Sequence, residues 1–471
     1  MRALSASRDD KYRELKDYVV ASTGLAYYET RDDDFEERID RRLRSLGLTN
    51  YGTYLTLLHD GVLGQSELDH LIAELTIGET FFFRDERQFD VLRGLIMPDL
   101  LRRNRPRKTM RIWSAGCASG AEAYSLSVVL QDEFRAQTAG WDISILGTDV
   151  NRRLLTQAQS GCYEKWALRS TPDEVRERCF VADGNHWRIA DRYKQGVGFQ
   201  YHNLVKHQTP SWLNGLFSFD LILCRNVMIY FDRPTAAAVV HRLHDCLVPQ
   251  AWLVVGHADH DPNTFRKFEA VSQNGVSVYR KPGGPDVAGS ALPDASAQAF
   301  AGNPVLAAAG TQNGGGTQEV DPPPALPAAD PATSSGGRPP ERFLGEVRSL
   351  ADAGAWAKAE ALCSGLIEEG PLDPIPHFYL ALILEQLGRF GEAEKSLRRS
   401  VYLDRKFVLA HYHLGLLLVR GGQQRAARQC FANALTLLAG LHETYVFDHG
   451  DGICAADLRD LTEMNLEGLS A

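Results

Sequence analysis

Short apolar runs alternate with amphipathic stretches between about residues 109 and 282, and this alternation limits the possible folds more than any other feature of the chain. The runs predict strands and the stretches predict helices: strands over 110–113, 143–147, 219–223, 251–255 and 276–279, and helices over 119–131, 151–159 and 235–247. Strands this apolar are buried on both faces, as in parallel sheets covered by helices. The sequence therefore predicts an α/β fold with a doubly wound, Rossmann-like sheet.

A short stretch inside this segment has a different pattern. Between Phe180 and Tyr201, strand-like pieces flank the turn sequence Asp183-Gly184-Asn185. A glycine-containing turn between two short strands is typical of a hairpin. We therefore expect a small antiparallel β insertion here.

Composition divides the chain into five parts. The 471 residues exceed one ordinary domain, and residues 283–340 are rich in Pro, Gly and Ala but poor in large apolar side chains. Such a segment cannot bury enough surface to offset its ordering entropy, which predicts a disordered linker. The predicted parts are a helical N-terminal domain (1–85), the α/β domain (86–282), the linker (283–340), a helical repeat unit (341–440) and a capping tail (441–471).

The part after the linker repeats with a period of 34 residues, the period of tetratricopeptide repeats, whose small residues let paired helices pack closely. Two repeats are clear and a third, earlier one is degenerate. A tail helix over 455–464 is expected to cap the α-helical solenoid. The recurring pairs are Gly388 and Gly422, Ala393 and Ala427, and Leu397 and Phe431.

Charge and cysteine usage exclude several classes of protein. The net charge is −9, with 51 basic and 60 acidic residues, which disfavours a nucleic-acid binder. Eight scattered cysteines without a CxxC pair disfavour a disulfide scaffold or a zinc site. The sequence contains neither an apolar signal core nor a run near the roughly 20 apolar residues of a membrane span. We therefore expect a cytoplasmic protein with no metal and no insertion into a membrane.

The strongest local signal for a binding site is the segment 112–122. A predicted strand runs through a turn with Gly116 and Gly120 into a helix, so a ligand can approach the backbone beside free N–H groups. The spacing is not GxGxxG, so dinucleotide binding is not indicated. Glu122 is a candidate ligand contact. Alternatively, Ser119 and Glu122 form a capping box with a purely local role.

Two further candidates follow predicted strands. Asp149 comes just past the second strand, where an acid accepts hydrogen bonds from a ribose diol; the alternative is an N-cap for the next helix. Cys224, Arg225 and Asn226 follow the strand over 219–223. Because ligands of open α/β sheets bind at the carboxyl ends of strands, we expect these residues to face the same site.

Two segments near the N-terminal domain leave alternatives open. Residues 78–84 read Gly-Glu-Thr-Phe-Phe-Phe-Arg, which suits either a loop beside a ligand or core packing with a surface charge. Arg38, Arg41 and Arg42 share one face of a predicted helix. That face suits either docking of an acidic partner or a solvated surface with acidic neighbours.

Taken together, these segments resemble the CheR family of chemotaxis-receptor glutamate methyltransferases. Residues 80–84 resemble the family's T-x-F-F-R segment, 113–125 its W-S-A-x-x-x-x-G-E-E-P-Y-S segment, and 224–232 its C-R-N-V-x-I-Y-F-D segment. Residues 41–48 resemble the basic helix of its N-terminal domain. The resemblance covers about residues 10–282, and the added repeats resemble a family branch from surface-sensing and biofilm pathways.

The resemblance implies that S-adenosylmethionine is the cofactor, and it assigns roles to ten residues. Arg84 and Tyr230 are the implied catalytic residues, with Tyr230 beside the transferring methyl. Two departures from the family pattern are Ala121 and Ala123, which replace an acid and a proline; Gly78 also stands where some members have an asparagine. The implied cofactor contacts are Thr80 and Arg84 at the methionine end, Glu122 on the ammonium, Asp149 on the ribose, Asn203 and Leu204 beside the adenine, and Cys224, Arg225 and Asn226 on the floor.

The implied reaction is methyl transfer to a glutamate in the helical cytoplasmic region of a chemoreceptor. A glutamate carboxylate has an unperturbed pKa near 4.3, so it is nucleophilic at neutral pH without a general base. Catalysis then consists of orientation and desolvation. The alternatives are a methyltransferase for another acidic protein, and an interaction scaffold in which the repeats act beside a vestigial methyltransferase domain.

We also expect the repeats to bind a separate, unidentified ligand. Their predicted concave groove is lined partly by His377, Tyr379, His411 and Tyr412. The flexible linker would let this contact raise the effective concentration of substrate without fixed docking. Some family members add a receptor pentapeptide to their β insertion as a strand; the short insertion here predicts no dependence on that tether.

Overall fold

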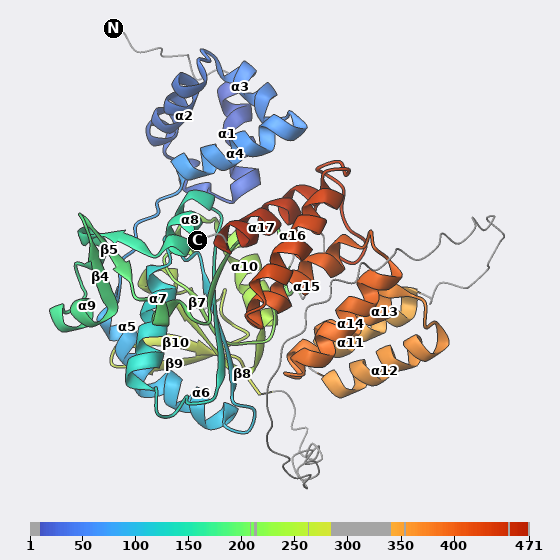
Figure 1. The fold of residues 1–471 in the computed structure, drawn as a ribbon. Coiled ribbons are helices and arrows are strands. Elements are labelled where there is room, and N and C mark those ends of the chain that lie inside the picture. Colours follow the sequence, from blue (N-terminus) through green and yellow to red (C-terminus); the bar gives the residue numbers. More distant parts are fainter. Residues whose placement is uncertain are drawn as a thin grey trace, which may run out of the picture.

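The computed structural model describes residues 10–207, 209–211, 214–261, 263–283, 341–352, 355–450 and 453–469. Except for Gly283, the linker predicted over 283–340 lies outside the described residues. An N-terminal helical group, an α/β unit and a C-terminal helical group follow one another along the chain (Figure 1). Within the described ranges, no helix is both long and apolar enough to cross a bilayer.

The N-terminal group consists of four helices around an aromatic-rich core that includes Tyr12, Phe35 and Ile39. The second of them starts with three aspartates in its first turn and ends at Gly47, whose φ of 69° is the left-handed conformation of a helix C-cap. The helices are α1 (Asp10–Thr23), α2 (Asp32–Leu46), α3 (Tyr51–Leu58) and α4 (Gly61–Leu75).

The main sheet has seven strands in the order β6-β2-β1-β7-β8-β10-β9. The first five are parallel, which confirms the predicted Rossmann-like core, whereas β10 is antiparallel to both of its neighbours. Asn274 and Gly275, with φ of 53° and 76°, form the hairpin turn that makes β9 and β10 antiparallel, and the sequence analysis overlooked this turn. The strands are β1 (Thr109–Ala115), β2 (Asp142–Asp149), β6 (Val197–Tyr201), β7 (Phe219–Cys224), β8 (Leu247–Val255), β9 (Glu269–Gln273) and β10 (Val276–Arg280).

Helices cover the two sheet faces unequally. One face packs against α5, α6 and α7, and the other packs against α10. The described residues between β6 and β7 form turns, where a doubly wound fold usually places a helix. The helices are α5 (Glu86–Val91), α6 (Met97–Asn104), α7 (Ala121–Val128), α8 (Arg152–Ser160) and α10 (Arg233–Cys246).

A separate three-stranded antiparallel sheet, in the order β3-β5-β4, confirms the predicted insertion. Its hairpin turns at Gly184, whose φ is 61°. Only part of the predicted stretch belongs to it, because residues 197–201 pair in parallel with β2 in the main sheet. The elements are β3 (Cys162–Glu164), α9 (Asp173–Cys179), β4 (Phe180–Asp183) and β5 (His186–Ile189).

The C-terminal group consists of three helical hairpins and a final helix, in agreement with the predicted repeats (Figure 1). Small residues permit the close packing: a Cβ added at Gly415 would lie 2.5 Å from the Phe431 ring. The predicted tail helix begins at 455 as expected but extends further. The helices are α11 (Glu341–Asp352), α12 (Trp356–Glu369), α13 (Pro374–Gln386), α14 (Phe390–Leu403), α15 (Val408–Arg420), α16 (Gln424–Leu438) and α17 (Ala455–Gly468).

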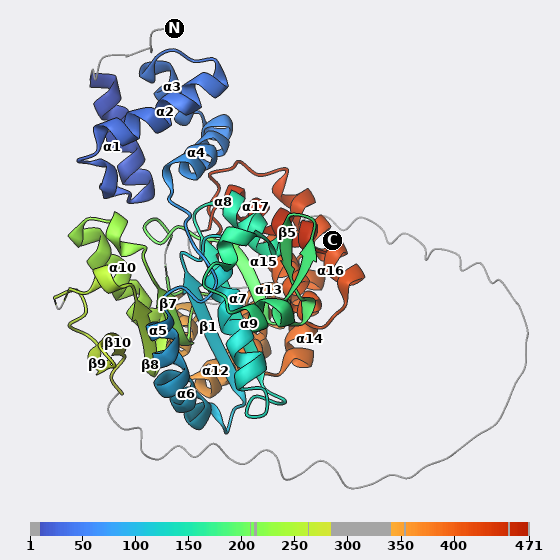
Figure 2. The ribbon, with the colours of Figure 1, turned by 90° about the vertical axis from the view of Figure 1, so that its left-hand side faces the viewer.

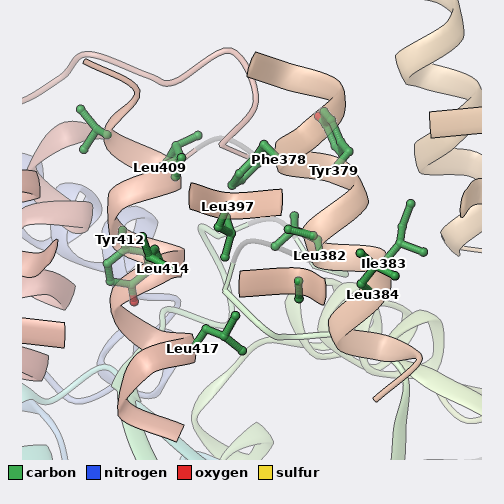
Figure 3. Packing of buried hydrophobic residues seen from close by; sticks show 14 of the residues in the cluster. Phe378, Tyr379, Leu382, Ile383, Leu384, Leu397, Leu409, Tyr412, Leu414 and Leu417 are labelled. Atoms are coloured by element: carbon green, nitrogen blue, oxygen red, sulfur yellow. The ribbon is translucent and has the colours of Figure 1, made fainter. Parts of the chain in front are cut away.

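Two of the four residues predicted to line the repeat groove, Tyr379 and Tyr412, do not line a surface. Tyr379, His411 and Tyr412 are only 3%, 6% and 2% exposed, and both tyrosines belong to the apolar core between the helices (Figure 3). A 34-residue period identifies equivalent positions but does not reveal which helix face points inward. The two tyrosines therefore hold the repeats together, whereas His411 lines a shallow hollow and His377 is half-buried.

The repeat unit lies against the α/β unit, on the side of α8, in both views (Figures 1 and 2). Phe217, just before β7, joins the repeat core, and its ring lies 6.2 Å from that of Trp356. Arg420 at the end of α15 pairs with Asp142 at the start of β2. The described part of the repeat unit therefore contacts the α/β unit directly, through residues outside the linker.

Candidate functional site

A pocket opens at the carboxyl ends of β1, β2 and β7, where the strand order runs in opposite directions from β1. This switch point is the usual ligand position in open α/β sheets. The N-terminal helices close it from above with Tyr27, Tyr28 and Leu75. Nine of the ten predicted site residues line it: Thr80, Arg84, Glu122, Asp149, Asn203, Leu204, Arg225, Asn226 and Tyr230.

Cys224 is the predicted site residue that does not line the pocket. Its side chain is fully buried in the apolar cluster that contains Trp113 and Val255, and this burial raises the pKa of the thiol well above its usual value. The reason is that β7 extends through residue 224, so strand alternation turns the thiol into the core.

The loop after β1 is shaped by two glycines. Gly116 and Gly120 have φ of 75° and 81°, and added Cβ atoms would lie 2.3 Å from Val227 and 2.7 Å from Phe199. The amides of Gly116 and Cys117 donate to the Thr148 carbonyl at 2.7 and 2.9 Å. Glycine is therefore required at both positions, and the loop is held against the end of β2.

Glu122 belongs to a buried polar chain, and not to a capping box. The N-cap of α7 is Gly120, with no side-chain capping bond. The Glu122 carboxylate instead accepts hydrogen bonds from Ser114 Oγ at 2.6 Å and from Arg225 Nη1 at 3.0 Å. Arg225, only 8% exposed, also donates to the carbonyl of Arg84 at 2.5 Å. One guanidinium thus ties the Arg84 loop to the start of α7.

Asp149 holds the neighbouring loops through its carboxylate. Its Oδ2 accepts from the amide of Ala118 and its Oδ1 from the amide of Asn151, both at 2.8 Å. Burial raises the pKa of this carboxyl. The alternative N-cap role belongs to Asn151, whose side chain accepts from the amide of Leu154. Each Asp149 oxygen retains a lone pair for a second donor, such as a hydroxyl.

Asn203 uses its side chain within the protein. Its Oδ1 accepts from the amides of Val205 and Lys206, and its Nδ2 donates to the carbonyl of Ser22 in α1 at 3.2 Å. The side chain therefore fixes the loop and ties it to the N-terminal helices. The backbone here and the side chain of Leu204 remain for contact with a flat, apolar group.

The opposite end of the pocket carries Arg84 and Tyr230. Arg84 donates to the carbonyl of Glu79 at 2.9 Å, and its neighbours Phe83 and Asp85 both have left-handed φ, 55° and 66°. Non-glycine residues rarely adopt this conformation, so the Arg84 turn is strained. Tyr230 is half-buried beside Tyr27, with ring centroids 5.7 Å apart, and burial raises the pKa of its hydroxyl.

Comparison with known proteins decides the family. Residues 78–276 match the family described as CheR methyltransferase, SAM binding domain, and residues 10–76 match CheR methyltransferase, all-alpha domain. The chain belongs to the CheR methyltransferase family. Residues 377–407 match a tetratricopeptide repeat. The resemblance found from the sequence motifs is thereby confirmed, and with it a domain of the type that binds S-adenosylmethionine.

Two relatives illustrate how the match is distributed. The chemotaxis protein methyltransferase of Escherichia coli is 31% identical over 280 residues, which cover 58% of this chain and 91% of the relative. The probable biofilm formation methyltransferase WspC of Pseudomonas aeruginosa is 28% identical over 401 residues, which cover 84% of this chain and 91% of WspC. The similarity to WspC thus extends beyond the methyltransferase domain.

Sequence reasoning also missed a residue behind the pocket: Asp259 does not line it but holds the backbone of Asn226, which does. Asp259 accepts hydrogen bonds through Oδ2 from the amides of Gly256 and Asn226, at 3.0 and 3.2 Å. Asn226 has a left-handed φ of 58°, and burial raises the pKa of Asp259 to about 6. The available signal was position, because Asp259 follows the carboxyl end of a predicted strand just as Asp149 does.

The expected arginine face of the N-terminal domain does not exist as a unit. Arg42 forms a two-pronged ion pair with the buried Glu67, at 2.9 and 2.5 Å, and Arg38 donates to the carbonyl of Glu74. Only Arg41 keeps a half-exposed side chain, 3.9 Å from carboxylates of Glu37 and Glu74. Two of the three arginines therefore stabilise their own domain.

Proposed function

We propose that this protein transfers a methyl group from S-adenosylmethionine to glutamate side chains of a chemoreceptor, which produces glutamyl γ-methyl esters. The observation that carries the proposal is the convergence of Glu122, Asp149, Arg225 and Tyr230 on one pocket in a chain of the CheR methyltransferase family. The relatives named chemotaxis protein methyltransferase support a receptor as substrate.

The residues of the pocket suit this cofactor. Two carboxylates, Glu122 and Asp149, complement an ammonium group and a ribose diol, and Leu204 offers an apolar wall for a purine. The glycine loop brings backbone atoms close to the ligand. When bound, the cofactor supplies an electrophilic methyl group. The protein then has to orient the two reactants and exclude water.

Arg84 and Tyr230 are proposed to act on the incoming carboxylate. Both line the pocket, and Arg84 lowers the pKa of the Tyr230 hydroxyl against the effect of burial, so the two groups influence one another. A guanidinium attracts the glutamate and a tyrosine hydroxyl donates to one of its oxygens. Because a glutamate carboxylate is already ionised and nucleophilic at neutral pH, it would accept the methyl group that the bound cofactor supplies without a general base.

The parts outside the pocket are proposed to select the substrate. Tyr27 of the N-terminal domain lines the pocket and is partly exposed, which supports a role for that domain in receptor docking. The β4–β5 hairpin has a turn of only two residues, so independence from a receptor pentapeptide remains our prediction. The repeats are proposed to bind a protein partner, because residues 377–407 match a tetratricopeptide repeat and such solenoids present extended binding surfaces.

The test combines cofactor binding with methyl transfer. Calorimetry with S-adenosylmethionine should give a saturable isotherm, and methyl-labelled cofactor should label cytoplasmic fragments of receptors from the same genome. Glutamyl methyl esters release methanol in mild base, which separates them from methylated lysine or arginine. Binding without labelling of any receptor fragment would favour another acidic protein as substrate. Absence of binding would favour the alternative of a vestigial domain beside an interaction scaffold.

A further inference from the structure

One arginine of the α/β unit contacts both the N-terminal helices and the last C-terminal helix. Arg152, the first residue of α8, forms ion pairs with Asp69 of α4 through Nε at 2.9 Å and with Asp460 of α17 through Nη2 at 2.7 Å. Its guanidinium carbon also lies 3.7 Å from the centre of the Tyr201 ring at the end of β6. The side chains of Arg152, Asp69 and Asp460 are 24%, 17% and 33% exposed, so water screens these charges only in part.

The arginine does not line the cofactor pocket itself, but its neighbours in the chain do. The residue before it, Asn151, caps α8 and donates from Nδ2 to the Thr76 hydroxyl at 2.7 Å. Two residues after it, Leu154 lines the pocket and touches Gly78 so closely that an added Cβ would lie 2.4 Å away. Through its chain neighbours, Arg152 is therefore connected to Asp149, Thr76 and Leu154, all of which line the pocket.

The final helix makes further contacts at the same place. Asp457, one turn before Asp460, lies 3.9 Å from Nε2 of His207, in the loop that also contains Asn203 and Leu204. The Escherichia coli relative aligns over 91% of its length with 58% of this chain. Its unmatched tenth is too short to contain α11 to α17, so this support for the pocket is an addition in the present chain.

We propose that Asp460 is a positioning residue of the cofactor site: through Arg152 it fixes α8 and the N-terminal domain around the pocket, so cofactor affinity depends on the C-terminal helix. The inference rests on the proposed cofactor. It assigns the C-terminal helices a role within their own chain. A partner that displaces α17 would remove Asp460 from Arg152 and so loosen the pocket wall beside Arg152.

The experiment measures cofactor affinity in full-length variants. Asp460→Asn keeps the size of the side chain and removes its charge, and we expect it to raise the Kd of S-adenosylmethionine about fivefold or more. The KM for the cofactor should rise with it, while kcat at saturating cofactor stays unchanged. The matched control is Glu463→Gln, which removes an equal charge from an exposed position on the same helix and should leave the Kd unchanged.

A double-variant cycle separates positioning from general stability. Asp69→Asn removes the second partner of Arg152 from the N-terminal side. If both carboxylates act through Arg152, the Kd of the double variant will differ from the product of the two single effects. Independent effects, or an Asp460→Asn Kd within twofold of the wild type, would overturn the inference. Failure of the wild-type protein itself to bind the cofactor would instead refute the proposed function.

Discussion

Arg225 and Arg152 are both held by two partners beside the same pocket, but they differ in what they connect. Arg225 is almost fully buried and joins Glu122 to the Arg84 carbonyl, all within the methyltransferase core. Arg152 is partly exposed and joins Asp69 and Asp460 from two other parts of the molecule. The pocket floor, which contains Glu122 and Arg225, is thus built within the α/β unit. The wall formed by α8 and the N-terminal helices, here called the closing side, depends on contacts between separate parts of the chain.

The difference teaches where the site is rigid and where it is adjustable. A buried charge without its partner is costly, so the floor tolerates little change. Partly exposed ion pairs contribute less and weaken with salt, so the closing side can open at modest cost. Variants of the floor are therefore expected to have larger effects than variants of the closing side.

The largest effect is expected from Arg225→Met. This change leaves the Glu122 carboxylate largely buried with only Ser114 as donor. Removal of one partner from a buried pair typically costs about 3 to 5 kcal/mol in the free energy of unfolding. Urea unfolding followed by circular dichroism measures it. The double variant Glu122→Gln/Arg225→Met, which removes both charges, should be less destabilised than Arg225→Met; equal loss would contradict the pairing.

Arg84→Ala and Tyr230→Phe should reduce turnover while the fold persists. Each removes a group that is proposed to orient the incoming carboxylate in the pocket, and loss of this orientation should lower kcat about 100-fold. The Arg84 carbonyl, which binds Arg225, survives in the alanine variant. Initial rates with labelled cofactor, compared at equal thermal stability, measure the effect. Wild-type turnover in both variants would remove these residues from the proposed mechanism.

Asp149→Ala should weaken cofactor binding by roughly 1–3 kcal/mol, the value of two lost hydrogen bonds to a ribose diol. Calorimetry gives the Kd directly. Asp191→Ala is a suitable control, because that side chain is 93% exposed and outside the pocket. If the Kd of Asp149→Ala equals that of Asp191→Ala, then Asp149 does not bind the cofactor and only holds the loops that contain Ala118 and Asn151.

These expectations also show how far the sequence could lead. Glu122 and Asp149 were predictable because each follows a recognisable strand and turn, and the site residues of one α/β fold meet at one sheet edge. The capping-box alternative for Ser119 and Glu122 remained open, since local spacing cannot show that Arg225 reaches Glu122 from a distant strand.

The errors of prediction have a common physical origin. Cys224 is predicted to line the pocket because the predicted strand ends at residue 223. The strand extends through residue 224, and because side chains alternate between the two faces of a strand, the Cys224 thiol points into the core. Tyr379 and Tyr412 were placed in a groove because a repeat does not define its inner face. The pair of Arg152 and Asp460 joins distant parts of the chain, and no local pattern predicts it.

The pH dependence of stability tests the turn at Asp259. Burial raises the pKa of this carboxyl from 3.8 to about 6, so the folded protein binds its proton more tightly than the unfolded chain does. Its contribution to stability is therefore fully present below about pH 4 and is lost as the pH rises through 6. Asp259→Asn has no such titration. The difference in unfolding free energy between the two proteins should change across pH 4 to 6; a constant difference would contradict the raised pKa.

The smallest effect is expected at Arg41, on the outermost part of the closing side. Its side chain is 48% exposed and its guanidinium lies 3.9 Å from the carboxylates of Glu37 and Glu74, so Arg41→Ala should change the free energy of unfolding by less than about 0.5 kcal/mol. If this charge attracts an acidic receptor helix, the receptor KM should rise a few-fold at low salt and converge with the wild type at high salt.

Arg42→Ala provides the contrast: it leaves Glu67 buried without its guanidinium partner, so it should lower stability and should not produce a salt-dependent KM. If the receptor KM is the same with and without Arg41 at every salt concentration, docking is left to uncharged groups such as Tyr27 at the pocket, whose contacts depend little on ionic strength.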